Sequence, residues 1–421
     1  MKKTVKIFDK SDSFRSAQQH LKPKKCILFI AEAVTLAHVA RPYVLASSLD
    51  SGDYDVHFAC DGRFDALFSD SKLAKVSIRS ISPPDFLDAL AKGKPVYDTP
   101  TLRQYVKDDL RLIEHVNPDL IVGDFRLSLT VSARLAKVPY ANITNIYWSP
   151  YAVQTYPVPE HVMVRLLGPA LAQPLFDLMR PLVFASHTLP LNRIRKEFGL
   201  TSLGSDLRVT YTDGDYVLYA DIPGLVKTTE LPPNHYYLGP ILWSPETFKP
   251  DWWSRLERHQ PIIYLTLGSS GETRRLPELV AELSSLPVTL LVATAGRFQL
   301  KNLPPNVLCS DYLPGDDAAA IADLVICNGG SPTTNQALSA GVPILGICAN
   351  LDQYLNMQAV QQNGAGRLLR AGTISGIEIV KVVREILTNL SYKTAAEKLG
   401  RAYREYDASA RFAAFTDELL R

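Results

Sequence analysis

Short runs of hydrophobic residues alternate along the chain with longer segments in which hydrophobic positions recur every three or four residues. In the first half, the short runs occupy residues 26–31, 55–59, 119–123 and 140–144. Segments with helical spacing lie between them, at residues 37–49, 102–116 and 130–136. A strand that is hydrophobic along its whole length is typical of a parallel sheet covered by helices on both faces. The pattern therefore predicts a doubly wound α/β domain.

The same alternation begins again near Pro261. The predicted strands are residues 262–267, 289–294, 307–310, 324–327 and 344–347, followed by a helix at residues 376–390. Residues 237–249, which contain Gly-Pro and Ser-Pro pairs, suit a linker between the two halves. In such domains ligands bind at the carboxyl ends of the strands. We therefore expect two Rossmann-like domains that face each other across a cleft.

The expected domain boundaries follow from these patterns. Residues 1–24 form a polar extension, 25–240 the first domain, 241–260 the linker, 261–400 the second domain, and 401–421 a C-terminal helix that can pack back on the first domain. Residues 147–190 interrupt the rhythm, because they are rich in proline and aromatic residues and then become strongly apolar. We expect a buried helical insertion there rather than a surface that contacts a membrane.

Composition narrows the class of protein. The 421 residues, with 46% hydrophobic and 21% charged side chains, are ordinary for a folded chain of two or three domains. A formal net charge of +2 gives no reason to expect nucleic acid as a partner. Five scattered cysteines without a CxxC pair argue against structural zinc and for reduced thiols in the cytoplasm.

Membrane and secretion signals are weak in the sequence. The first 24 residues are polar and lack the apolar stretch of a signal peptide. No run of about 20 apolar residues predicts a transmembrane helix. Peripheral membrane contact stays open.

Residues 325–356 carry the clearest chemistry. A buried strand ends at Cys327 and runs into the sequence NGGSPT at residues 328–333. Small residues let the backbone approach an anion, and the positive end of the following helix favours a diphosphate. The residues alone thus indicate a cleft enzyme that handles a phosphate-bearing ligand.

This segment resembles the donor-binding signature of the UDP-glycosyltransferase superfamily, whose fold is GT-B. Besides the Gly-Gly pair, the matching elements are Gly341-Val342-Pro343, Asp352-Gln353 and Asn356. Weaker matches are Gly239-Pro240, Leu267-Gly268-Ser269 and Tyr312-Leu313-Pro314. The resemblance implies a metal-independent transferase with a nucleotide sugar as co-substrate, and hence no cofactor.

By the same resemblance, the donor contacts fall on particular residues. They are, for the diphosphate, Gly330, Ser331, Thr333 and either Ser269 or Ser270; for the base, Tyr312; for the sugar hydroxyls, Asp352 and Gln353. Asn328 stands where the family usually has a phosphate-binding His, and Gln336 where it usually has a ribose-binding Glu. Gly315 replaces a common Gln. Neutral amides can still bind these groups, so the departures concern the identity of the donor or the level of activity.

The acceptor side is implied by a His and a Pro near the first strand, here His38 and Pro42. The family's His takes a proton from the acceptor hydroxyl, and an imidazole is a competent base at neutral pH. Asp124, at the end of a predicted strand, would orient it; Glu32 is the alternative acid. An aromatic group would form an apolar acceptor pocket: Tyr147, Trp148, Tyr151 and Tyr156.

Together these features predict an inverting glycosyltransferase that moves a sugar, most simply from a UDP-sugar, to a hydroxyl of a small lipophilic acceptor. Inversion is expected because one base without an enzyme nucleophile implies a single displacement. The alternative is a catalytically weakened GT-B scaffold that acts as a binding or regulatory protein. Asn328 and Gln336 motivate that alternative, whereas intact His38 and Asp124 argue against it.

Overall fold

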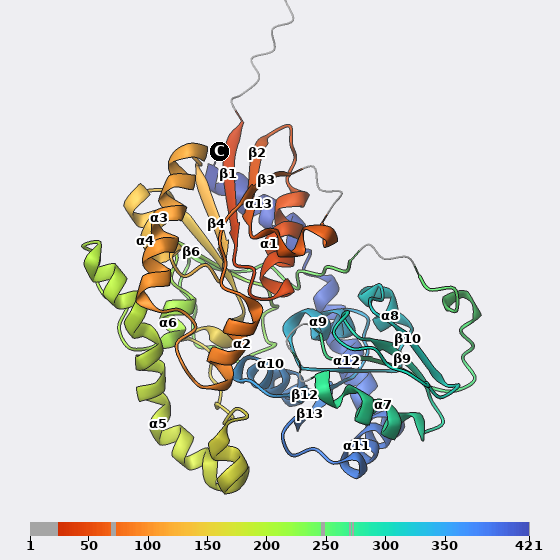
Figure 1. Cartoon of the computed structure of the whole chain (residues 1–421). Coiled ribbons are helices and arrows are strands. Elements are labelled where there is room, and N and C mark those ends of the chain that lie inside the picture. The colour runs from red at the N-terminus through yellow and green to blue at the C-terminus, as the bar shows by residue number, and fades with distance from the viewer. Residues whose placement is uncertain (1–23, 69–72, 246–248, 269–270, 272, 421) are drawn as a thin grey trace, which may run out of the picture.

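The computed structural model describes residues 24–68, 73–245, 249–268, 271 and 273–420. It contains two parallel sheets, each covered by helices (Figure 1). The first sheet has the order β3-β2-β1-β4-β5-β6-β7 and the second the order β10-β9-β8-β11-β12-β13. Both orders reverse direction once, between β1 and β4 and between β8 and β11, and such switch points are where doubly wound sheets bind ligands.

The first domain contains both expected and unexpected elements. Its strands are β1 (Lys25–Ala31), β2 (Tyr54–Cys60), β3 (Ala74–Ser77), β4 (Leu120–Asp124), β5 (Tyr140–Thr144), β6 (Tyr216–Tyr219) and β7 (His235–Tyr237). Its helices are α1 (Leu36–Ser48), α2 (Pro83–Ala91), α3 (Thr99–Val116), α4 (Leu129–Ala136), α5 (Val162–Glu197) and α6 (Leu207–Tyr211). The strands β3, β6 and β7, which have three or four residues, were not predicted from the sequence.

The second domain repeats the architecture. Its strands are β8 (Ile262–Thr266), β9 (Thr289–Ala293), β10 (Val307–Ser310), β11 (Leu324–Cys327), β12 (Ile344–Cys348) and β13 (Gly366–Arg370). Its helices are α7 (Leu276–Ser284), α8 (Gly315–Ile321), α9 (Ser331–Ser339), α10 (Leu351–Gln362), α11 (Gly376–Thr388) and α12 (Leu390–Arg404). The sequence GRLLR of β13 has an arginine near each end, so its pattern did not predict a buried strand.

The last helix, α13 (Ala408–Leu420), lies against the first domain, beside α1 and β1 (Figure 1). Phe412 is fully buried there, with its ring centroid 5.7 Å from that of Phe29. The Tyr54 hydroxyl donates a hydrogen bond to Asp417. The described residues therefore begin and end in the first domain, and the two domains are connected twice.

The expectation of a buried insertion at residues 147–190 is wrong for α5. This helix runs along the outside of the first domain and projects beyond it (Figure 1). Nine large hydrophobic side chains on it are exposed: Val162, Leu166, Leu167, Leu171, Leu175, Leu178, Met179, Leu182 and Leu189. Hydrophobicity alone cannot show whether a partner covers a face. By length and composition α5 could also cross a membrane, which the sequence did not lead us to expect.

Candidate active site

A cavity of about 1150 Å³ lies between the two domains. Its walls include the start of α1, the carboxyl ends of β4 and β5, the linker, and the segment from Asn328 to Gln336. We call the part of the cavity that is lined by apolar side chains of α2 and α5 the apolar arm. Both switch points of the two sheets therefore open into one space.

His38 and Asp124 meet at the first switch point. His38 Nδ1 lies 2.7 Å from Asp124 Oδ1, and the Asp124 side chain is fully buried. A carboxylate only accepts hydrogen bonds, so Nδ1 carries the proton and Nε2 is the atom that can accept one. The His38 ring stacks on Phe125, with centroids 4.7 Å apart and planes at 15°. Phe125 directly follows β4 and has a left-handed backbone conformation, φ 57°, which is uncommon for a non-glycine residue. In this conformation its ring lies against the His38 ring.

Arg41, one turn after His38 on α1, is a site residue that the sequence did not reveal. Its Nε and Nη2 donate to the two oxygens of Asp124, both at 2.8 Å, and Nη1 donates to Asn145 Oδ1 at 2.7 Å. Asn145 in turn donates to Asp221. Burial raises the pKa of Asp221 to about 6. A buried carboxylate needs a paired charge. Arg41 supplies it and fixes the orientation of Asp124 toward His38.

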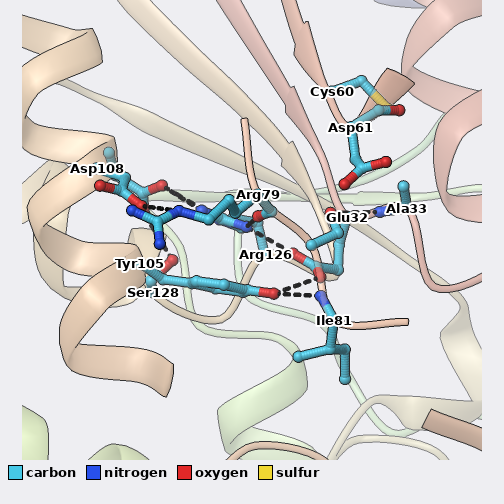
Figure 2. Close-up of polar contacts among 12 residues, drawn as sticks. Glu32, Ala33, Cys60, Asp61, Arg79, Ile81, Tyr105, Asp108, Arg126 and Ser128 are labelled. Carbon is cyan, nitrogen blue, oxygen red and sulfur yellow. Dashed lines mark hydrogen bonds and ion pairs between the residues drawn. The ribbon is translucent and has the colours of Figure 1, made fainter. Parts of the chain in front are cut away.

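Glu32 is not a second catalytic acid, nor a solvated loop charge. It is fully buried, 2.8 Å from Arg126 Nη1, and accepts a hydrogen bond from the Tyr105 hydroxyl (Figure 2). Arg126 also pairs with buried Asp109 at 3.0 Å. Burial raises the pKa of Glu32, while the Arg126 charge opposes that rise. The network connects the loop after β1 to the loop after β4, in which Arg126 directly follows Phe125.

The second switch point carries the amino end of α9. Gly330, Ser331 and Thr333 line the cavity, and Asn328 Oδ1 accepts a hydrogen bond from the Gly330 amide at 3.1 Å. Gly329 has φ 83°, and a Cβ there would lie 2.7 Å from Cys348 Sγ, so glycine is required. The amide ends and positive dipole of this helix face the cavity as an anion site would. Ser269 and Ser270 lie outside the described residues.

Gln336 and Gly315 form one structural feature. Gln336 Nε2 donates to the Trp243 carbonyl at 2.9 Å and to Ser244 Oγ at 3.0 Å. A Cβ on Gly315 would lie 2.8 Å from the Gln336 amide. Because Gly315 has no side chain, the Gln336 side chain has room to extend past it to the linker. Its Oε1 is the atom of the amide that can accept a hydroxyl of a ligand.

Replacing Gln336 with glutamate is expected to lower the free energy of unfolding by about 1–3 kcal/mol, measured by urea titration. A carboxylate cannot donate, so it would face the Trp243 carbonyl oxygen without a proton between them. The matched control is Gln299→Glu, because Gln299 is exposed and the substitution makes the same change of charge in the same domain. Equal stability of the two variants would contradict the role assigned to Gln336.

Asp352 and Gln353 lie in the first turn of α10 and line the cavity. Asp352 Oδ1 accepts a hydrogen bond from the Trp148 indole at 2.8 Å, which links the two domains. Gln353 is buried, and its Oε1 accepts the Ala349 amide at 2.8 Å. Its Nε2 has no partner among the described residues. A buried donor without a partner costs about 1–3 kcal/mol.

The expected aromatic acceptor wall is only partly correct. Trp148 lines the cavity. Tyr312, which was expected beside the nucleotide base and not in this wall, also lines it, and its hydroxyl donates to the Ala295 carbonyl at 3.2 Å. Tyr147 is fully buried in the core and Tyr151 packs edge-on against His235, and neither lines the cavity. The 3₁₀ turn η2 (Ile146–Trp148) explains the difference, because it directs successive side chains to different sides.

The apolar wall comes instead from two helices that the sequence did not connect with the site. From α2 the lining side chains are Phe86, Leu87 and Leu90, and from α5 they are Phe176, Val183, Phe184 and His187. Helical spacing on each segment was the available signal, but it could not show that both helices line the same cavity.

One group of possible metal ligands occurs in the described part of the chain. The ligand atoms of Cys26, Asp55 and His57 lie within 4.8 Å of one another. No pattern in the sequence connects these residues, because β1 and β2 become neighbours only in the sheet. They lie toward the amino ends of those strands and do not line the cavity.

Comparison with known proteins agrees with this geometry. Residues 268–406 match the family model "Erythromycin biosynthesis protein CIII-like, C-terminal domain". The chain is 48% identical over 388 residues, 92% of its length, to a PGL/p-HBAD biosynthesis glycosyltransferase of Mycobacterium tuberculosis, and covers 91% of it. It is 49% identical over 380 residues, 90% of its length, to a PGL/p-HBAD biosynthesis rhamnosyltransferase of Mycobacterium bovis, and covers 84% of that protein.

Solved structures share the fold. The glycosyltransferase SsfS6 of Streptomyces sp. SF2575, complexed with thymidine diphosphate, superposes with a TM-score of 0.65 at 18% identity. The match covers 94% of this chain and 99% of SsfS6. With two doubly wound domains, one interdomain cavity and relatives at almost half identity over nearly the whole chain, the protein belongs to the UDP-glycosyltransferase superfamily and is a GT-B glycosyltransferase.

Proposed function

We propose that the enzyme transfers a sugar from a nucleoside diphosphate to a hydroxyl group of a lipophilic acceptor, with inversion at the anomeric carbon. The observation that carries the proposal is the 2.7 Å contact between His38 Nδ1 and Asp124 Oδ1, on the wall of the cavity that also holds the amino end of α9. A base and an anion site in one cavity supply the two ends of a displacement reaction.

On the acceptor side, His38 Nε2 takes the hydroxyl proton as the acceptor oxygen attacks the anomeric carbon. The bond from that carbon to the diphosphate oxygen breaks in the same step. Asp124 stabilises the imidazolium that forms, and Phe125 holds the ring plane. A single displacement inverts the anomeric configuration.

On the donor side, the amides and hydroxyls at Gly330, Ser331 and Thr333 meet the charge of the leaving diphosphate. Asn328 shapes this loop, and Gln336 offers Oε1 to the ribose. Asp352 and Gln353 hydrogen-bond the sugar, and Tyr312 lies beside the base. Because helix dipole and amides supply the positive end, the proposal includes neither a metal nor a cofactor. The free cysteines, three of them buried, support the cytoplasm as the compartment.

The relatives suggest which substrates to test first. One of them is named a rhamnosyltransferase, and both belong to PGL/p-HBAD biosynthesis. We therefore propose rhamnosyl as the first sugar, with UDP and thymidine diphosphate as the first two carriers. The apolar arm between α2 and α5 favours an acceptor with a hydrophobic body.

The test combines donor and product. We expect acceptor-dependent release of nucleoside diphosphate when the enzyme is given UDP- or thymidine-diphosphate-linked rhamnose or glucose with a hydroxysteroid or long-chain alcohol. The product should have the anomeric configuration opposite to that of the donor, read from NMR coupling constants. Retention would refute the single displacement. Nucleotide binding without release from any donor, across a wide acceptor panel, would favour the non-catalytic scaffold.

A further inference from the structure

The outer side of α5 is an unusually large exposed apolar surface. We define the α5 outer face as Leu171, Leu175, Leu178, Met179, Leu182 and Leu189, which are 40–74% exposed. In the described part of the chain, nine of the thirteen exposed large hydrophobic side chains lie on α5. Single exposed hydrophobic residues are normal, but a contiguous patch marks a contact surface.

The helix has two sides with different environments. After a break at Gly168, with φ 74°, the buried side chains of α5 include Phe176, Phe184, Thr188 and Leu191. Their spacing places them opposite the outer face, which extends over about 27 Å of helix axis. Because one side of the helix is packed on the first domain, α5 can lie along a membrane but not pass through it.

Charges avoid the outer face and gather at its ends. Between Leu171 and Leu189 the charged residues are Asp177 and Arg180, and the Arg180 guanidinium lies 4.2 Å from the Tyr156 ring on the packed side. Exposed Arg165, which also lines the cavity, precedes the face, and exposed Arg193, Lys196 and Glu197 follow it. Glu197 is paired with Arg103 at 2.7 Å, which leaves the two basic residues at this end in excess. Basic residues at the ends of an apolar helix face are typical of contact with an anionic lipid surface.

The residues that flank the face do not favour a paired helix as its partner. Positions 171, 175, 178, 182, 185 and 189 follow the heptad pattern of a coiled coil. The positions that flank this seam, where charged pairs select a partner helix, hold Ala172, Met179 and Ser186 on one side and Pro174, Pro181 and Thr188 on the other. None is charged, so nothing specifies a second helix. Lipid requires no such specification.

The same helix connects this surface to the cavity. Phe176, Val183 and Phe184 line the apolar arm, so the arm and the outer face are separated by the width of one helix, about 10 Å. A hydrophobic acceptor held in a bilayer would be within reach of the arm without crossing water.

We propose that the α5 outer face rests on an anionic lipid surface and that this contact brings the apolar arm of the cavity to the lipid. The inference deepens the proposed function at its acceptor end, but the binding itself requires no catalysis. Binding of the chain to lipid vesicles can therefore be measured independently of sugar transfer.

The experiment is co-sedimentation of the full chain with vesicles of phosphatidylcholine and phosphatidylglycerol, 1:1, and with phosphatidylcholine alone. We expect binding to the mixed vesicles, weaker binding to the neutral ones, and at least about tenfold weaker binding to both for Leu178→Glu/Leu182→Glu. These side chains are exposed and do not line the cavity. Transfer to a water-soluble acceptor should therefore be unchanged, and this rate also reports that the variant is folded.

The matched control carries the same two changes on another surface. Ile377→Glu/Leu390→Glu replaces exposed hydrophobic side chains of the second domain, 85% and 76% exposed, and should bind vesicles like the wild type. Arg193→Ser/Lys196→Ser should remove the preference for the anionic vesicles and leave the neutral binding.

Two results would overturn the proposal. One is a wild-type chain that stays in the supernatant with both kinds of vesicle. The other is a dimer of the wild type, measured by light scattering, that dissociates in Leu178→Glu/Leu182→Glu without any vesicle binding. In that case a second copy of the chain covers the face.

Discussion

Replacing His38 with alanine is expected to lower turnover by about 10²–10⁴-fold, the usual contribution of a general base. The Kd for the donor nucleotide should stay within about twofold, because His38 lies on the first-domain wall of the cavity, whereas the proposed anion site is the amino end of α9 in the second domain. Steady-state kinetics and calorimetric titration with the nucleoside diphosphate measure the two quantities.

The matched control is His187→Ala, since His187 lines the apolar arm of the same cavity. Burial lowers the pKa of His187, so it is neutral at neutral pH, as a base must be, and its Nε2 lies 3.2 Å from the Gly93 carbonyl. It has no carboxylate partner comparable to Asp124 in the described residues. We expect His187→Ala to change the KM for the acceptor and keep most of kcat. The opposite ranking of the two variants would assign the base to His187.

Replacing Asp124 with asparagine is expected to lower turnover by about 10²–10⁴-fold. Asp124 accepts from His38 Nδ1 and twice from Arg41, and an amide cannot accept all three. If Nδ2 of the new asparagine points to His38, Nδ1 must accept, and the ring proton moves to Nε2. The imidazole then presents a proton to the acceptor instead of a lone pair.

Loss of the Asp124 charge also leaves Arg41 buried without its carboxylate, which costs about 3–5 kcal/mol. Stability and catalysis must therefore be separated. Asp221→Asn removes another buried carboxylate from the same chain of contacts. Asp221 contacts Asn145, and Asn145 contacts Arg41, which lies beside His38. We expect Asp221→Asn to lower the melting temperature and keep most of kcat. If its kcat falls as far as that of Asp124→Asn while both stay folded, Asp124 acts only through the structure.

Much of this enzyme follows from local sequence. The apolar runs at residues 26–31 and 262–267 predicted the central strands β1 and β8, because a strand buried on both faces must be hydrophobic along its length. The NGGSPT segment predicted a turn from strand to helix, because glycine and the helix amino end leave few other conformations. These features depend on neighbours within a few residues, so sequence specifies them.

The contacts between distant residues could not be read in the same way. Arg41 lies in the helix pattern of α1 like a surface residue, and only the approach of β4, more than 80 residues later, buries it against Asp124. Gln336 looked like a change in a ribose contact, whereas the structure shows that it donates to the linker through the space left by Gly315. Each side chain acquired its role from a partner that no local pattern identifies.

The difference between what the sequence determined and what the tertiary structure decided is largest at α5 and Tyr147. By itself the sequence determined that residues 147–190 hold an aromatic cluster followed by an apolar segment, expected to be helical. Tertiary structure alone decided that one side of α5 lines the cavity while the other faces outward, and that Tyr147 is core while Trp148 meets Asp352. The physical reason is that hydrophobicity measures the cost of exposure to water, whereas burial depends on which surface the rest of the fold places opposite.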